Sequence, residues 1–158
     1  MTPAPAPWDE ARAAQIIRAH AGLEGALLPV FHALQAEFGC ISDEAAALAA
    51  EILNISRAEA HGVLTFYHDF RRSPPGRHVL KLCRAEACQA RGARTVEARV
   101  TGELGVGFGE TTSDAAVTLL PAYCLGLCAS GPAALLDERP VARLEGERLE
   151  RLIRDARA

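Results

Sequence analysis

The chain has 158 residues, of which 49% are hydrophobic, and its formal net charge at pH 7 is −3. This length and apolar content suffice for one ordinary domain, or a small domain with an appendage, to bury a core without help from a metal. The acidic balance argues against nucleic acid as a partner, and no apolar run approaches the length of a membrane span. We therefore expect a soluble protein that neither binds nucleic acid nor inserts directly into a membrane.

Residues 1–8 are dominated by proline and alanine and predict a disordered tail. They lack the basic, apolar and small-residue segments of a secretory leader. The sequence therefore predicts a cytoplasmic location. This location and the odd number of cysteines, five, both disfavour structural disulfides.

Residues 9–72 carry helical patterns and predict an N-terminal helical region. Apolar residues recur at helical intervals over 9–20 and again over about 27–38, where Gly39 is a helix stop. We therefore expect two amphipathic helices in this stretch. Because an apolar appendage without chemistry of its own invites a partner, we also expect this region to be a docking surface.

Two serines with capping patterns predict further helices in the same region. Ser42 precedes two acidic residues and should cap a third helix. The buried stripe expected on that helix consists of Leu48, Ala49, Ile52 and Leu53. Ser56 and Glu59 have the spacing of a capping box, which opens a fourth helix that we expect to continue toward Phe70. Prolines and a glycine follow, so a domain boundary is predicted at 72–77.

The remaining stretch, 77–158, alternates strand and helix patterns and predicts a second domain. Strands are expected at 77–82 and 117–120, with a helix between them from about Cys88 to Gly105. The buried stripe expected on this helix consists of Ala93, Val96, Val100 and Leu104.

A strand pair and a final helix are predicted after these elements. The pair comprises 133–136 and 141–144, and the second strand should lie at the sheet edge because Pro140 cannot donate to a central ladder. The final helix begins near Gly146. Its expected core face consists of Leu149, Leu152 and Ile153. The predicted fold class is therefore α/β, a helical bundle followed by a small sheet flanked by helices.

Four of the five cysteines form two short pairs, each placed after a predicted strand. Cys83 and Cys88 enclose four residues, and Cys124 and Cys128 enclose three. Such spacing lets two thiolates reach one metal centre at little cost in loop-closure entropy. Because the two strand ends can meet at one edge of a sheet, we predict a single site with four sulfur ligands.

Several interpretations of this site remain open. Both spacings suit structural zinc, whereas a dithiol redox enzyme uses a pair separated by two residues, which neither pair has. An iron–sulfur cluster is favoured because Gly126, between Cys124 and Cys128, allows backbone N–H groups to reach the sulfurs. The N-terminus of a helix near Cys88 would stabilise the electron added on reduction.

Other residues near these patterns carry weaker signals. Cys40 follows an apolar helix and is expected to be a buried small residue, not a ligand. Arg84 and Arg91 could add positive charge near the cluster, but solvated arginines without a role are equally compatible with the pattern, so neither is assigned a function. The aromatic residues that end the fourth helix are expected to belong to the core: Phe66, Tyr67 and Phe70.

Four groups of residues, spread over most of the chain, together match one known family. They are Gly62-Val63-Leu64-Thr65-Phe66-Tyr67, the first cysteine pair with Gly92, Gly109-Glu110-Thr111-Thr112, and the second cysteine pair with Pro132. In this order they resemble the thioredoxin-like 2Fe-2S ferredoxin subunits, the family of the small flavin-adjacent subunit of complex I. The resemblance implies a helical region over 9–72 and a thioredoxin-like domain over 77–158. It also implies that one 2Fe-2S cluster is held by Cys83, Cys88, Cys124 and Cys128.

Within this family, the chain most resembles the gamma subunit of soluble NAD-dependent formate dehydrogenase. Tyr67-His68-Asp69-Phe70-Arg71 and Tyr123, directly before Cys124, carry this finer resemblance. One departure is the predicted hairpin turn Asp137-Glu138-Arg139-Pro140, where relatives often have a glycine.

The resemblance implies an electron carrier in an NAD-dependent oxidoreductase, with no catalytic residue on this chain. The implied partners are a flavin-binding, NADH-oxidising subunit with FMN and NAD, and a large formate dehydrogenase subunit with a molybdenum cofactor. The equivalent subunit of complex I or of an NAD-reducing hydrogenase is an alternative. A zinc-stabilised interaction module is the alternative from another functional class.

Overall fold

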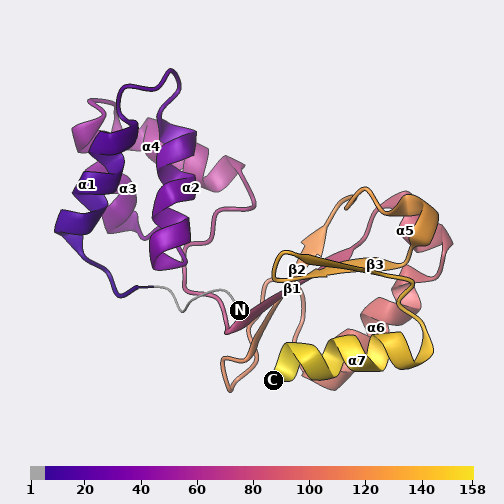
Figure 1. The fold of residues 1–158 in the computed structure, drawn as a ribbon. Coiled ribbons are helices and arrows are strands. Elements are labelled where there is room, and N and C mark those ends of the chain that lie inside the picture. Colours follow the sequence, from indigo (N-terminus) through magenta and orange to yellow (C-terminus); the bar gives the residue numbers. More distant parts are fainter. Residues whose placement is uncertain (1–5) are drawn as a thin grey trace. The chain divides into compact units, whose positions relative to one another are not determined.

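The computed structural model describes residues 6–158, and the chain divides into two compact units between Pro74 and Pro75 (Figure 1). Each unit has a hydrophobic cluster of its own. The predicted mixed α/β class is confirmed, with helices in both units and a four-stranded sheet in the second. Over residues 6–158, every helix is too short or too polar to span a bilayer.

Four helices form the first unit: α1 (Glu10–His20), α2 (Leu27–Phe38), α3 (Asp43–Ile52) and α4 (Arg57–Phe66). All four helices expected from the sequence are present. The left-handed residue Gly39 ends α2, and the Ser42 hydroxyl caps α3 by accepting from the Ala45 N–H. Ser56 and Glu59 make both hydrogen bonds of the predicted capping box. Local signals therefore account for where these helices begin and end.

Two details of the first unit differ from the sequence prediction. The buried face of α3 consists of small residues, namely Ala45, Ala46, Ala49 and Ala50. The larger residues of the predicted stripe are only partly buried: Leu48, Ile52 and Leu53. The helix α4 stops at Phe66 and does not continue toward Phe70, because Tyr67 has an extended backbone.

Contacts of the first unit begin before α1. The Ala6 N–H donates to the Glu37 carbonyl oxygen at 2.9 Å, and the Trp8 ring lies 5.1 Å from the Phe38 ring. Residues 6–8 of the predicted tail are therefore attached to α2, while residues 1–5 lie outside the described residues.

The second unit contains the sheet, whose strand order is β2-β1-β3-β4. The strands are β1 (His78–Cys83), β2 (Val117–Ala122), β3 (Ala133–Leu136) and β4 (Arg139–Ala142). β1 pairs with β2 in parallel and with β3 antiparallel, and β4 is the predicted edge strand. The register aligns Cys83 with Ala122, so β1 and β2 end side by side at one edge of the sheet.

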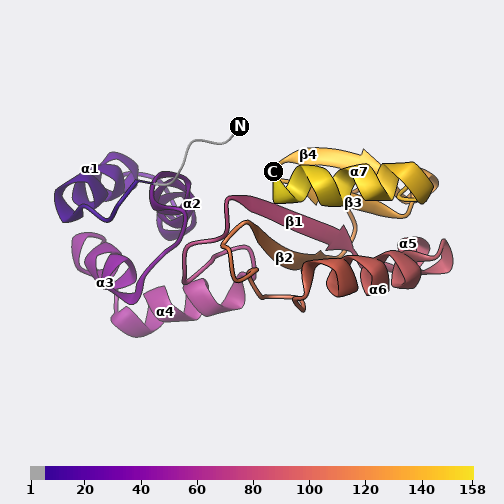
Figure 2. The ribbon, with the colours of Figure 1, turned by 90° about the horizontal axis from the view of Figure 1, so that it is seen from below.

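Three helices and a 3-10 turn complete the second unit: α5 (Glu86–Ala90), α6 (Ala93–Leu104), η1 (Cys128–Ser130) and α7 (Gly146–Arg157). The helices α6 and α7 lie on the same face of the sheet (Figures 1 and 2) and share one hydrophobic cluster with β1, β2 and β3. The buried stripes predicted for both helices are confirmed.

A break at Gly92 corrects the predicted helix after the first cysteine pair. The sequence pattern suggested one helix from Cys88 to Gly105, but Gly92 is left-handed, with φ of 88°, and separates α5 from α6. Cys88 lies inside α5, which has only five residues. The helix expected to begin near Cys88 thus begins at Glu86, two residues earlier, and stabilisation of a reduced cluster by its N-terminus stays a prediction.

The β3–β4 hairpin turns at Asp137, which has a left-handed φ of 56°. Its carboxylate accepts from the Val79 N–H at 3.0 Å and lies 3.0 Å from His78 Nδ1. Aspartate tolerates this backbone region, and here its side chain also ties the turn to β1. The turn places β4 at Arg139–Ala142, two residues before the predicted strand at 141–144.

Gly76 gives a stability test of this fold. A Cβ at Gly76 would lie 2.9 Å from the Ala115 carbonyl oxygen and 3.0 Å from the Val117 nitrogen. Gly76→Ala should therefore lower the free energy of unfolding by about 1–3 kcal/mol, the usual effect of overpacking a filled site. Denaturant unfolding measures this change.

Gly102 provides the matched control for the same substitution. It lies exposed inside α6, and a Cβ there would meet no atom within 4 Å. Gly102→Ala should raise the free energy of unfolding by about 0.5–1 kcal/mol, because alanine is the better helix former. Equal stability of the two variants would contradict the close packing around Gly76.

Candidate metal centre

The sheet topology brings the two cysteine pairs to one edge. Cys83 is the last residue of β1, and Cys124 follows the end of β2 by two residues. Since β1 and β2 are parallel neighbours, both strands deliver their cysteines to the same side. The Arg84 N–H extends this pairing by donating to the Ala122 carbonyl oxygen at 2.7 Å. The predicted grouping of distant cysteines thus has a direct cause in the strand order.

The Cys83 sulfur accepts hydrogen bonds from both segments of the site. Its backbone donors are the N–H groups of Ala85, Cys124 and Leu125. Burial raises the pKa of the Cys83 thiol, but these donors and the Cys88 thiol outweigh that effect, so the pKa lies below its ordinary value. The same donors therefore favour the thiolate form of Cys83, which is the form of cysteine that binds metals.

The Cys88 thiol lies buried beside the Cys83 sulfur. Burial raises the pKa of Cys88, and the hydrogen bond and charge of Cys83 raise it further. The Ala133 N–H donates to the Cys88 sulfur, and a Cβ at Gly131 would lie only 3.1 Å from Cys88 Sγ. The chain that follows Cys128 therefore closes over Cys88 at a position where the close approach favours glycine.

Cys124 and Cys128 form the exposed half of the site, with their Sγ atoms 3.6 Å apart. Cys124 is left-handed, with φ of 81°, and Gly126 between them has φ of 74°. The Gly126 N–H donates to Cys124 Sγ at 3.5 Å, as the glycine in this loop predicted. The hydrogen bond with Cys124 and its charge raise the pKa of Cys128.

The four thiols are arranged as two pairs. Within residues 6–158, no three His, Cys, Asp or Glu side chains are grouped as one metal ion would require. Cys83 contacts Cys88, Cys124 contacts Cys128, and N–H groups of the second segment bind the Cys83 sulfur. A 2Fe-2S cluster takes four cysteine thiolates, two on each iron, and backbone N–H groups donate to its sulfurs. The donor set and its pairing fit this cluster.

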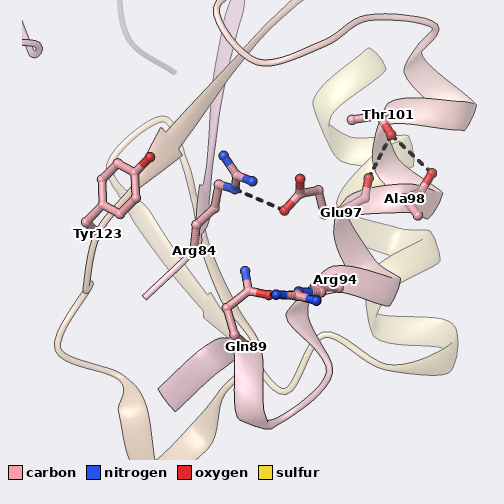
Figure 3. Close-up of a pocket in the computed structure, with 7 residues that line it drawn as sticks. All are labelled: Arg84, Gln89, Arg94, Glu97, Ala98, Thr101 and Tyr123. Atoms are coloured by element: carbon pink, nitrogen blue, oxygen red, sulfur yellow. Dashed lines mark hydrogen bonds and ion pairs between the residues drawn. The ribbon is translucent and has the colours of Figure 1, made fainter. Parts of the chain in front are cut away.

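An open cavity of about 610 Å³ lies next to the cysteine segments (Figure 3). Its lining residues are Arg84, Gln89, Arg94, Glu97, Ala98, Thr101 and Tyr123. The Arg84 guanidinium points toward Glu97, with Nε 3.1 Å from Oε2, and lies 4.8 Å from the Phe108 ring centroid. Arg84 is therefore held by α6 and by an aromatic ring, which is a structural role.

Sequence reasoning missed two residues that contact Cys88, namely Gly131 and Ala133. It also assigned no role to Arg91, whose Nε–H donates to the Gly131 carbonyl oxygen at 2.9 Å. The glycine and proline that follow Cys128 were the available signal, because glycine often marks a close approach of the backbone. Cys40 belongs to the first unit, where it is half-buried and burial raises the pKa of its thiol.

Comparison with known proteins places this site in a family. The model of the family described as "Thioredoxin-like [2Fe-2S] ferredoxin" matches residues 13–157. The chain belongs to this family. The resemblance inferred from the motifs is therefore confirmed, and the thioredoxin-like [2Fe-2S] ferredoxin match covers both units.

Several relatives are named as subunits of an enzyme. The NADH-quinone oxidoreductase subunit designated E from Pseudomonas aeruginosa is 37% identical over 105 residues, which are 66% of this chain and 63% of that protein. The corresponding protein of Escherichia coli is 36% identical over 120 residues, which are 76% of this chain and 72% of that protein. The match with the Pseudomonas protein therefore spans less than two thirds of that relative's length.

A solved structure of similar fold is an NAD+-reducing [NiFe]-hydrogenase in the H2-reduced state. The similarity has a TM-score of 0.71 and 25% identity, and it covers 82% of this chain but only 22% of the hydrogenase chain. This ferredoxin family fold thus also occurs as one part of a longer polypeptide.

The exposure of the sulfurs predicts two classes of thiol in the metal-free chain. Cys124 and Cys128 are exposed, whereas Cys83 and Cys88 are 3% and 1% exposed. A maleimide should modify the exposed pair faster, on the order of tenfold or more, because buried thiols react only after local opening. Peptide mapping after brief labelling measures the rates, and denaturant should make all sites react alike. Equal labelling rates for the two cysteine pairs under native conditions would contradict the finding that one pair is buried and the other exposed.

Proposed function

We propose that this chain is an electron-transfer subunit that carries one 2Fe-2S cluster beside a flavin-binding, NADH-oxidising partner. The observation that carries the proposal is the meeting of two cysteine pairs at one sheet edge, in a chain of the thioredoxin-like [2Fe-2S] ferredoxin family. The proposed ligands are Cys83, Cys88, Cys124 and Cys128. The cluster, when bound, would supply one-electron redox chemistry, and no residue of this chain would be catalytic.

The contribution of the chain is to hold the ligands and to set their surroundings. Cys83 and Cys88 keep one half of the site away from water. Backbone N–H groups directed at sulfur, such as that of Gly126, favour the negative charge that reduction adds. Cys124 and Tyr123, the latter 73% exposed, leave the other half open, so this is the side that a redox partner can approach.

The first unit is proposed to dock onto the partner. The sequence predicted core positions for three aromatic residues, but only Phe70 is buried, whereas Phe66 is 72% and Tyr67 42% exposed. The rings of Phe66 and Tyr67 pack edge to face, with centroids 5.1 Å apart. An exposed pair of large aromatic side chains is typical of interface anchors, which supports a docking role for this unit.

For the parent complex, we propose an NAD-dependent formate dehydrogenase in the cytoplasm. The support is the resemblance over residues 67–71 and at Tyr123. In that assembly, FMN and NAD would reside on the flavin-binding subunit, and the molybdenum cofactor on a large subunit. Complex I is the second candidate, favoured by the similarity to the NADH-quinone oxidoreductase proteins. An NAD-reducing hydrogenase is a third, favoured by the fold similarity.

The cluster is tested by colour, metal content and ligand replacement. The purified chain should be reddish-brown, contain about two irons with acid-labile sulfide, and give an electron paramagnetic resonance (EPR) signal only after reduction. Serine at any of the four proposed ligands should deplete iron and sulfide, whereas the matched control Cys40→Ser should retain both. A colourless protein with one zinc per chain would instead support the zinc-stabilised interaction module.

Purification of the tagged full chain from its own host tests the parent complex. We expect a flavin-binding subunit and a subunit that contains molybdenum to be recovered with it. Recovery with a nickel-containing subunit, or with a quinone-reducing membrane arm, would overturn the formate dehydrogenase proposal.

The same purification tests docking through the first unit. Phe66→Ser should reduce recovery of the flavin-binding subunit about tenfold or more, since an aromatic anchor commonly contributes about 2 kcal/mol. The iron content of the Phe66→Ser variant should stay unchanged. Leu23→Ser also removes an exposed apolar side chain, 51% exposed between α1 and α2, and is the matched control.

A further inference from the structure

A single side chain links the segment that carries Cys88 to the segment that leaves Cys128. Arg91 directly follows α5, and its Nε–H donates to the Gly131 carbonyl oxygen at 2.9 Å. Gly131 lies 40 positions further along the chain, between η1 and β3. The hydrogen bond is partly buried, so it is shielded from competition with water.

The packing around this hydrogen bond restricts the loop that contains Gly131. A Cβ at Gly131 would lie 3.1 Å from Cys88 Sγ and 3.4 Å from Arg91 Cδ, so the space between the loop and these side chains has no room for a larger residue. Cys88 and Arg91 lie close on one side of the loop, and the hydrogen bond from Arg91 opposes movement of the loop away from them. The Ala133 N–H, which donates to the Cys88 sulfur, is held in place by the same arrangement.

We propose that Arg91 is a positioning residue for the cluster, acting through its hydrogen bond to Gly131. The bond sets the separation between Cys88 and the segment of Cys128, and thereby governs how long the cluster is retained and how its sulfurs are surrounded. This inference rests on the proposed function, since it requires the four cysteines to hold a 2Fe-2S cluster. The geometry assigns the effect to the Nε–H donor, not to the positive charge of the guanidinium.

Three substitutions at Arg91 separate the donor from the charge. Arg91→Gln places an amide nitrogen at the same number of bonds from Cα as Nε, so it keeps the donor and removes the charge. Arg91→Lys keeps the charge but has a methylene group at that position. Arg91→Met removes both and keeps a side chain of similar length.

The measurement is the rate of cluster loss from the loaded full chain in excess iron chelator, followed by visible absorption without oxygen. Arg91→Met and Arg91→Lys should lose the cluster about tenfold faster than wild type, which corresponds to about 1.4 kcal/mol. Arg91→Gln should stay within about twofold of wild type, because the hydrogen bond is retained. The EPR spectrum of the reduced cluster should shift in the Met and Lys variants and be restored in the Gln variant.

A matched control and a folding measurement accompany these variants. Arg94 lies three residues further along, in α6, and is exposed like Arg91, but its Nε–H donates to Gln89 Oε1 at 3.2 Å instead of to the Gly131 loop, so Arg94→Met should behave like wild type. Thermal unfolding of the metal-free chains shows whether any variant fails to fold. If the Arg91→Gln variant loses its cluster at the wild-type rate while the variants unfold at the same temperature, a general loss of stability does not explain the faster loss in the Met and Lys variants.

Two results would overturn the inference. One is an Arg91→Met variant that keeps its cluster and EPR spectrum as wild type does. The other is rescue by lysine but not by glutamine, which would assign the effect to charge. A wild-type chain that binds no iron and no sulfide would overturn the proposed function itself, and this result is visible before any variant is made.

Discussion

The parallel pairing of β1 with β2 is the constraint on which the rest of the second unit depends. It aligns Cys83 with Ala122, so the segments that follow the two strands begin at one sheet edge although they are about forty residues apart in the chain. The pairing is stabilised from one face by α6 and α7, whose apolar stripes share a cluster with Leu80 and Leu119. The core therefore holds the proposed cluster site at its edge, and none of the proposed ligands comes from its centre.

The site is asymmetric, and its asymmetry suits electron transfer. Cys83 and Cys88 are buried and surrounded by backbone N–H donors, whereas Cys124 and Cys128 are exposed. In the proposed cluster site, the buried half would retain the cluster and set its electrostatic environment, and the exposed half would admit a redox partner. This arrangement suits the one-electron carrier proposed above.

Three positions of the second unit meet a backbone constraint in three different ways. Cys124 is left-handed without being glycine, which costs of order 1 kcal/mol or more and persists only where the surrounding structure enforces it. That conformation turns the loop so that its N–H groups reach the Cys83 sulfur. At Gly131 the constraint is contact instead, because any side chain would approach Cys88 Sγ. At Asp137 the left-handed turn is occupied by a residue other than glycine, and its carboxylate accepts a hydrogen bond from β1.

By itself, the sequence determined the features that act over a few residues. Caps such as Ser56 and the stripes of α6 and α7 predicted real elements, because their interactions lie within one or two turns. Tertiary structure alone decided the alanine face of α3, the hydrogen bonds of Asp137 with β1 and the link from Arg91 to Gly131. These contacts join residues far apart in the chain, so they exist only once the strands have paired and the helices have packed.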